Sequence, residues 1–368
     1  MKKPSIRNIL VPVDFSTISV RTIETAKRLA HGFGASIHLA HVHHWQYPGD
    51  FMGPLIPVGK VRVSFEQHRR QRLTEELKMV AQASGLSAAL THLQEGPSAF
   101  HEICRLAQEI SADLIIMPTH GYTGLRHVLL GSTAERVVQH SPCPVFVLRE
   151  KKQRSKTERR LSIRKIVVPV DFSSCSREGL QYAIGFANKF GARIILLHVA
   201  YLGLIYSSED TPLLDIRGLQ EAARKTAERQ MRKLVRTVNF GRVKFETAFT
   251  DNSPVLDICA FAKDHDADLI ITATHGLTGL QHVLIGSTAE RVVRHAPCSV
   301  LVVPSHPQVR AANLAKSGSR KTQTLESWQK LRRPLPGKAP TKRDRKLAVH
   351  AFPERRKTNK FRESHFGI

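Results

Sequence analysis

The chain repeats itself, and the length of the repeat limits most strongly what it can fold into. Residues 6–44 and 163–201 match without a gap at 19 of 39 positions, and residues 112–139 and 267–294 match at 22 of 28. A repeat of about 145 residues is far longer than a solenoid unit and has the size of an ordinary domain. We therefore predict two copies of one domain, at residues 1–150 and 162–305, joined by a charged linker at 151–161.

Strand-like and helix-like segments alternate within each copy. In the first copy the predicted strands are 9–13, 37–42, 88–93, 114–117 and 145–148, and the predicted helices are 20–31, 62–83, 100–109 and 132–140. Strands that are apolar on both faces and are joined by helices form a parallel sheet that helices cover on both sides. The sequence thus predicts an α/β fold with two repeated, doubly wound domains.

The positive charge of the chain is concentrated outside the two copies. The net charge is +25, of which residues 306–368 contribute +13, while residues 1–150 and 161–305 contribute only +4 and +3. Residues 306–368 are also rich in proline and poor in apolar side chains, so we predict a disordered basic C-terminal tail. Such a tail can attract nucleic acid or another polyanion by releasing counterions, or it can be a solubilising extension.

Several classes of protein are disfavoured by composition. No apolar run approaches the roughly 20 residues of a membrane span, and Pro12 and Asp14 interrupt the apolar run near the start. Five cysteines without a CxxC pair do not suggest a disulfide framework. We therefore expect a cytoplasmic protein without membrane insertion.

One loop pattern occurs in both copies and is suited to binding an anion. A strand runs into THG, nine residues follow, and GST opens a helix. A loop that leaves the carboxyl end of a strand and enters a helix N-terminus presents backbone N–H groups to phosphate. The alternative is that Ser132 and Ser287 only open capping boxes, with Glu135 and Glu290 at the third helical position. The loop residues are Gly121, Gly131 and Ser132 in the first copy, and Gly276, Gly286 and Ser287 in the second.

A carboxylate ends the first strand of each copy. Asp14 and Asp171 close the string VPVD, where a carboxylate can accept hydrogen bonds from ribose hydroxyls or adenine donors. The alternative is that each aspartate caps the helix that follows. Four histidines at 38, 41, 43 and 44 are interpreted as a solvated or core-edge group rather than a metal site, and only His41 recurs, as His198.

These motifs together resemble the universal stress protein family. The resemblance rests on VPVDFS, the LAHV and LLHV strands, and G-x9-G-S followed by AERVV and SPC or APC, and it covers residues 5–149 and 162–304. It implies a five-stranded parallel sheet of order 3-2-1-4-5 in each domain, with ATP at the point where the strand order reverses. The family's first loop glycine is replaced by Pro118 in the first copy and by Ala273 in the second.

The resemblance also assigns roles to particular residues. Asp14 and Asp171 would meet the nucleoside, and Val42 and Val199 would offer backbone groups to adenine. The loop glycines and serines would hold the phosphates, and the last strands, 145–148 and 300–303, would pair within one chain. Dimerisation of two whole chains, as a homodimer, is a further possibility that the sequence leaves undecided.

We therefore expect an ATP-binding regulatory or adaptor protein of the stress response, with ATP as cofactor, either alone or with Mg²⁺. Two rival hypotheses remain at this point. The first is an enzyme, such as a slow ATP hydrolase. The second is a protein that associates with nucleic acid or ribosomes through its basic tail.

Overall fold

The computed structural model describes residues 5–44, 60–86, 89–119, 130–149, 162–201, 216–274 and 286–304. All of these belong to one compact unit, Met1–Asn313. The linker at 151–161, the tail at 306–368, and Gly121 and Gly276 lie outside the described residues, so the predictions made for them stay predictions.

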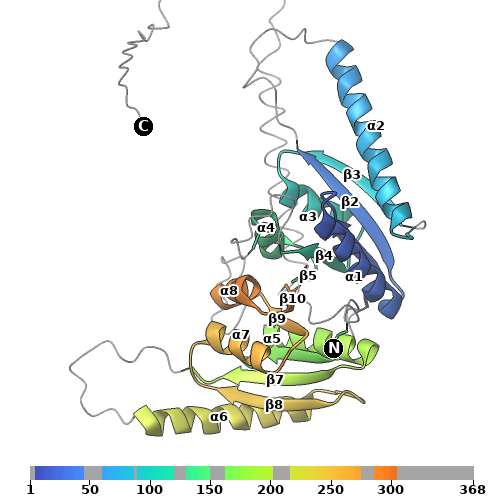
Figure 1. Ribbon diagram of the computed structural model, residues 1–368. Helices are drawn as coiled ribbons and strands as arrows, with labels where there is room; N and C mark the ends of the chain where they lie inside the picture. Colours follow the sequence, from blue (N-terminus) through green and yellow to red (C-terminus); the bar gives the residue numbers. More distant parts are fainter. Residues whose placement is uncertain are drawn as a thin grey trace, which may run out of the picture. The chain divides into compact units, whose positions relative to one another are not determined.

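Each copy of the repeat forms the predicted alternation of strands and helices (Figure 1). Domain 1 contains β1 Asn8–Pro12, α1 Thr17–Phe33, β2 Ser36–His44, α2 Lys60–Ala83, β3 Leu90–Gly96, α3 Ala99–Glu109, β4 Leu114–Pro118, α4 Ser132–His140 and β5 Val145–Leu148. Domain 2 contains β6 Lys165–Pro169, α5 Ser174–Phe190, β7 Arg193–Val199, α6 Ile216–Thr237, β8 Phe245–Thr250, α7 Pro254–Asp264, β9 Leu269–Ala273, α8 Ser287–His295 and β10 Ser299–Val303.

The strands of the two domains form one sheet of ten strands, with the order β3-β2-β1-β4-β5-β10-β9-β6-β7-β8. All pairs within a domain are parallel, which confirms the predicted order 3-2-1-4-5 in both copies. The last strands meet in the middle as the one antiparallel pair, with Leu301 opposite Phe146. The predicted pairing of the domains within one chain is therefore present in the structure.

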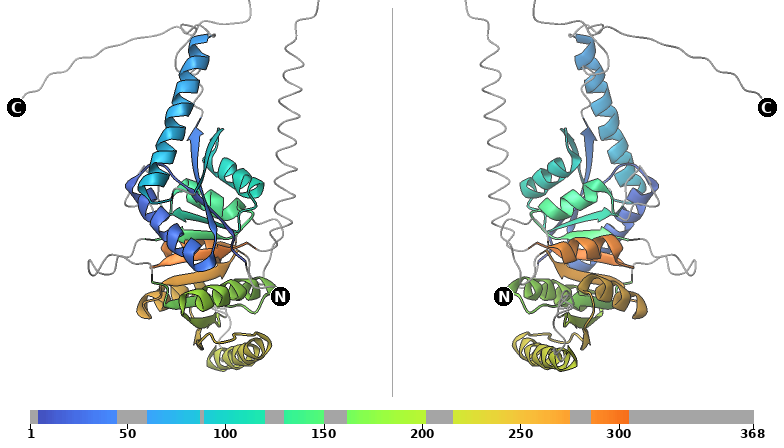
Figure 2. Two further views of the ribbon diagram at one scale, coloured as in Figure 1. Left: turned by 90° about the vertical axis from the view of Figure 1, so that its right-hand side faces the viewer. Right: turned by 90° about the vertical axis from the view of Figure 1, so that its left-hand side faces the viewer.

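Helices cover both faces of this sheet (Figure 2). The core on one face contains buried residues of α1, α2, α5 and α6, and the core on the other face contains buried residues of α3, α4, α7 and α8. Both cores include residues of both domains, so they run through the central pair of strands. Ile9, Leu10 and Val11 are all fully buried, as expected for a central strand that is packed on both sides.

Helix termini follow the local sequence. Ser16 and Ser173 are the N-caps of α1 and α5, and each serine side chain accepts a hydrogen bond from the backbone N–H three residues on. Gly34 and Gly191 end the same helices in the left-handed conformation, with φ of 72° and 67°. Each of these helices then returns the chain to the amino end of the next strand.

Candidate functional site

The candidate site of each domain lies where the strand order reverses. β1 pairs with β2 on one side and with β4 on the other, and α1 and α3 cover opposite faces of the sheet. Connections that leave in opposite directions open a crevice at the carboxyl ends of the strands. In domain 1 this edge carries Asp14, Val42, Gly131 and Ser132. In domain 2 it carries Asp171, Val199, Gly286 and Ser287.

The aspartate of each domain is held by serines of the following turn. Asp14 Oδ1 accepts hydrogen bonds from Ser16 N (3.1 Å), Ser16 Oγ (2.5 Å) and Ser19 Oγ (2.7 Å). Asp171 Oδ1 accepts from Ser173 N (3.0 Å) and Ser173 Oγ (2.6 Å). The hypothesis that the aspartates themselves cap the helices is therefore wrong, because the serine two residues later is the N-cap in both domains. The aspartate instead fixes the N-cap serine and the position of its own carboxylate.

The residue after the aspartate has a strained backbone in both domains. Phe15 and Phe172 have φ of 60° and 66°, in the left-handed region that favours glycine. Each phenylalanine ring packs on a histidine of the next strand, with ring centroids 4.3 Å apart for Phe15 and His41 and 4.5 Å apart for Phe172 and His198. Strain that is kept in both copies beside a crevice is typical of a binding site.

That histidine is fixed in one tautomer. His41 Nδ1 lies 2.8 Å from the carbonyl oxygen of Val13, and His198 Nδ1 lies 2.7 Å from that of Val170. Since a carbonyl can only accept, Nδ1 carries the proton and donates it. Burial lowers the pKa of His198, although the hydrogen bond to Val170 and the charge of Asp171 act to raise it. The lowered pKa of His198 favours its neutral imidazole, which is not a cation for phosphate.

The backbone of Val42 and Val199 faces the open side of the crevice. Val170 N–H donates to Leu197 O, and Ala200 N–H donates to Thr250 O on the opposite side of β7. Because alternate residues of a strand address alternate neighbours, Val199 presents its N–H and C=O toward β6, which has already ended at Pro169. The bond from Val13 N to Ala40 O places Val42 in the same way beside β1. Both valines therefore direct their backbone N–H and C=O groups toward the crevice.

The two domains differ at the end of the fourth strand. Ile115 and Thr119 donate their N–H groups toward β5, so position 118 between them addresses the crevice on the β1 side. Pro118 has no N–H to donate there. In domain 2, Thr274 N–H donates to Val303 O of β10, so the N–H of Ala273 points toward the crevice. Domain 2 thus offers one backbone donor that domain 1 lacks.

The residues that flank the predicted anion-binding loop are joined by the same hydrogen bond in both domains. Gly131 N–H donates to Thr119 O at 2.7 Å, and Gly286 N–H donates to Thr274 O at 2.6 Å. These two glycines are the N-caps of α4 and α8, and no side chain caps either helix. The capping-box interpretation of Ser132 and Ser287 is therefore wrong. Both serines are exposed at the first helical position, because each helix begins one residue earlier than a capping box requires.

A buried hydroxyl group, which the sequence did not single out, lies at the carboxyl end of β8 in domain 2. Thr250 is in register with Val199, and its Oγ1 is buried without a hydrogen-bond partner among the described residues. The register equivalent in domain 1 is Gln94, opposite Val42, and its Oε1 accepts a hydrogen bond from Arg105 at 2.6 Å. Because a buried hydroxyl normally has a partner, Thr250 suits a polar ligand group.

The histidines of β2 do not gather around one point. His38 is buried, and its Nδ1 lies 3.0 Å from Nε2 of His92 on β3, while His41 faces Val13. Over the part of the chain that the structure describes, no group of three or more His, Cys, Asp or Glu side chains is placed to hold a metal ion.

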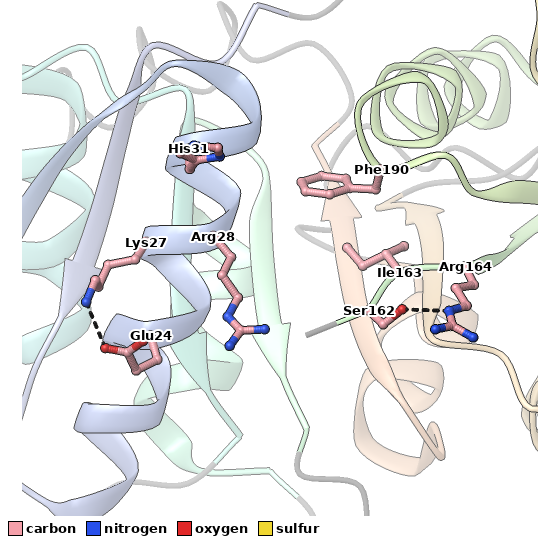
Figure 3. Close-up of a pocket in the computed structure, with 8 residues that line it drawn as sticks. All are labelled: Glu24, Lys27, Arg28, His31, Ser162, Ile163, Arg164 and Phe190. Carbon is pink, nitrogen blue, oxygen red and sulfur yellow. Dashed lines mark hydrogen bonds and ion pairs between the residues drawn. The ribbon is translucent and has the colours of Figure 1, made fainter. Parts of the chain in front are cut away.

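A separate groove of about 640 Å³ lies between α1 and α5 (Figure 3). Lys27, Arg28 and His31 line it from domain 1, and Arg164 and Phe190 line it from domain 2. α1 runs from the carboxyl end of β1 to the amino end of β2, so its C-terminal half lies at the amino edge of the sheet. The groove is therefore at the opposite edge from the candidate sites.

The comparisons with known proteins agree with this architecture. The model of the universal stress protein family matches residues 5–149 and 162–304, which is well over half of the chain. The chain therefore belongs to the universal stress protein family, as two tandem domains.

Two relatives show the single and the tandem form. A universal stress protein of Methanocaldococcus jannaschii is 32% identical over 140 residues, 38% of this chain and 81% of the relative. A universal stress protein of Mycolicibacterium smegmatis is 26% identical over 304 residues, 80% of this chain and 96% of the relative. A solved universal stress protein from Archaeoglobus fulgidus shares the fold, with a TM-score of 0.56, 20% identity, and coverage of 81% of this chain and 98% of that one.

Two further observations concern membrane-spanning helices and the cysteines. Among the described residues, no helix has the length and apolar character needed to cross a lipid bilayer. All five cysteines are free thiols, and Cys104, Cys143 and Cys298 are buried. Burial raises the pKa of the Cys143 thiol to about 12, so it is not a reactive thiolate at neutral pH.

Proposed function

We propose that this universal stress protein binds ATP at its strand-reversal crevices and acts as a regulatory or adaptor protein of the stress response. The observation that carries the proposal is the backbone of Val199 and Ala273, which faces the same crevice from two strands. Nucleotide-binding members of the family hold ATP at this point of the sheet. The free thiols favour a reducing compartment, and we propose the cytoplasm.

The residues at the site fit an adenine nucleotide. Asp171 would accept hydrogen bonds from the nucleoside, and Val199 would pair with adenine through its N–H and C=O. The N-terminus of α8, with Gly286 and Ser287, would hold the phosphates, because its first N–H groups have no partner within the helix. Gly276 is proposed as a further phosphate contact. Asp14, Val42, Gly121, Gly131 and Ser132 would act in the same way in domain 1.

The experiment that tests binding is mass spectrometry of small molecules released by denaturing freshly purified protein. We expect an adenine nucleotide, present in an amount comparable to the protein. If no nucleotide is released and added ATP does not bind, the proposal fails.

Hydrolysis of ATP is the second candidate function, and the structure gives it less support. The loop has no Lys or Arg at the same position in both copies, since Arg126 is matched by Gln281, and its serines and glycines supply no general base. A burst of phosphate release that is abolished by Asp171→Asn would favour the hydrolase instead. Binding to nucleic acid through the tail would be favoured by retention on DNA or RNA that disappears when the chain is cut at residue 306.

A further inference from the structure

Positive charge is segregated within domain 2, on α6 and the turn that follows it. Residues 216–245 hold nine of the seventeen Lys and Arg of this domain but two of its fourteen Asp and Glu. The segment therefore has a net charge of +7, and the rest of domain 2 has −4. All nine cationic side chains are exposed. The small net charge of the domain conceals this segregation.

The cations lie along one side of α6. Lys225, Arg229, Arg232 and Arg236 have spacings of four, three and four residues, which place them on one face of a helix. Ala227, Met231 and Leu234 are buried against the sheet with similar spacing on the other side. α6 lies along the outer strand β8, at the end of the sheet remote from β5 and β10 (Figures 1 and 2).

Few of these charges are neutralised within the domain. Lys225 forms an ion pair with Glu221 at 2.7 Å, and Arg224 and Arg232 lie 3.5 Å and 4.0 Å from Glu228. The other six have no ion pair among the described residues: Arg217, Arg229, Lys233, Arg236, Arg242 and Lys244. Neighbouring cations repel one another, and six cations without an ion pair among the described residues of an otherwise acidic domain favour an anionic partner.

We infer that α6 and the turn after it, residues 217–244, form a cationic surface that binds the phosphate backbone of double-stranded nucleic acid. Six of the nine cations are arginines, which contact phosphate with two parallel hydrogen bonds. α6 has 22 residues and is about 33 Å long. A DNA duplex carries one charge per about 1.7 Å of its axis, so a helix of this length can contact several phosphates. Contacts to phosphate alone carry no sequence preference.

A lipid surface fits less well. A helix that lies in a membrane interface buries an apolar face in the bilayer. The apolar face of α6 is already buried against the sheet, and among the described side chains of this helix Leu219 is the one large apolar residue that is exposed, at 39%. Residues 217–244 include none of the residues proposed for the two nucleotide sites.

The test measures binding of the full chain to a short fluorescent DNA duplex as a function of salt concentration. In the α6 variant, Arg229, Arg232, Lys233 and Arg236 are replaced by Gln, which preserves helix propensity. We expect the slope of log K against log salt to become shallower by about 3 to 4, since each lost phosphate contact removes about 0.9. The matched control replaces Arg69, Arg70, Arg72 and Lys78 of α2, four exposed cations on the corresponding helix of domain 1.

The control separates this surface from net charge and from the tail. Both variants lose four positive charges, and both must keep the thermal midpoint of the parent. We expect the α2 control to keep the parental slope. Equal losses in both variants, or no loss in either, would overturn the inference. So would an α6 variant that loses binding to phosphatidylserine vesicles but keeps its affinity for DNA.

Discussion

At the scale of single residues, the two sites differ most at position 118 and its counterpart 273. Ala273 can donate its N–H to a ligand in the crevice, whereas Pro118 cannot. A missing donor that leaves a ligand acceptor unpaired costs about 1–3 kcal/mol, or about 5- to 150-fold in affinity. Arg126, which only domain 1 has, could recover part of this through a phosphate contact, but exposed contacts of that kind contribute under about 1 kcal/mol. We therefore expect domain 2 to be the stronger site.

The hydroxyl of Thr250 provides a residue-level test of ligand contact. Thr250→Val removes a buried oxygen that has no partner among the described residues, while the shape of the side chain is preserved. We expect the thermal midpoint without nucleotide to stay the same or rise, because no hydrogen bond within the described protein is lost. ATP affinity should fall by about 2- to 12-fold, the equivalent of one ordinary hydrogen bond. A lower midpoint together with unchanged affinity would assign Thr250 to the fold.

The contact between the buried His38 and the half-buried His92 should make domain 1 sensitive to acid. Burial lowers the pKa of both imidazoles, so the folded state favours their neutral forms. Their contribution to stability is present above the ordinary pKa of about 6.5 and is lost as the pH falls through their lower folded values. The charge of Glu109 opposes this effect at His92, and Arg105 holds Glu109 in an ion pair.

The test of this prediction replaces the two histidines by the residues that domain 2 has at the equivalent positions. Ile195 and Ala248 occupy the equivalent positions of β7 and β8, so His38→Ile with His92→Ala copies an arrangement that the fold already accepts. Thermal midpoints should fall between pH 7.5 and pH 5 by less in the double variant than in the parent. An equal fall in both proteins would show that the pair does not carry the acid sensitivity.

At the scale of elements, the predicted bounds of the strands and helices of domain 1 lie within three residues of the observed ones. The strand 145–148 and the helix 132–140 have the predicted bounds, because proline and glycine mark their limits. α1 begins at Thr17, three residues before its prediction, because its first three residues, Thr17, Ile18 and Ser19, show no apolar period and only the Ser16 cap marks the start. The pattern Ser-x-x-Glu at the start of α4 and α8 led to the wrong capping interpretation. A capping box and a glycine N-cap followed by serine have the same sequence pattern.

The order of the strands, and the edge of the sheet that carries the site, could be predicted from the alternation of strands and helices and from the family resemblance. Other parts of the site could not be predicted from the sequence. The left-handed φ of Phe15 and the direction of the Val42 backbone depend on where neighbouring strands end. The hydroxyl of Thr250, which has no partner among the described residues, could not be predicted from the repeat, because the equivalent residue of domain 1 is Gln94 and the two residues belong to no shared motif. The recurrence of His41 as His198 was the one feature of the sequence that indicated the histidines packed on Phe15 and Phe172.

The central strand pair should contribute strongly to stability. Phe146 on β5 is fully buried and lies opposite Leu301 of β10, so it packs within the core that the two domains share. Phe146→Ala should lower the free energy of unfolding by about 3–5 kcal/mol, measured by urea titration. The control is Phe245→Ala on the outer strand β8, where the side chain is 39% exposed and about 1 kcal/mol is expected. Equal losses would contradict a shared core at β5 and β10.

At the scale of the whole molecule, the domains are joined by more than the linker. β5 and β10 pair in the sheet, Arg294 forms an ion pair with Glu135 across the junction at 2.9 Å, and Phe33 packs on Phe186 with ring centroids 5.0 Å apart. Separate fragments 1–150 and 162–305 should therefore associate when mixed at micromolar concentration, as measured by analytical ultracentrifugation. If they sediment independently, the tether alone holds the domains together.

The central claim is that ATP binds in these crevices and that domain 2 binds it more tightly. Isothermal titration calorimetry of the full chain, Gly286→Asp and Gly131→Asp with ATP tests it most directly. Both glycines have φ near −70°, so aspartate fits the backbone and can cap the helix, while its charge repels phosphate. We predict about one tight site per chain, which Gly286→Asp abolishes and Gly131→Asp leaves in place. Loss of tight binding in Gly131→Asp alone, or no binding by the parent chain, would contradict the account.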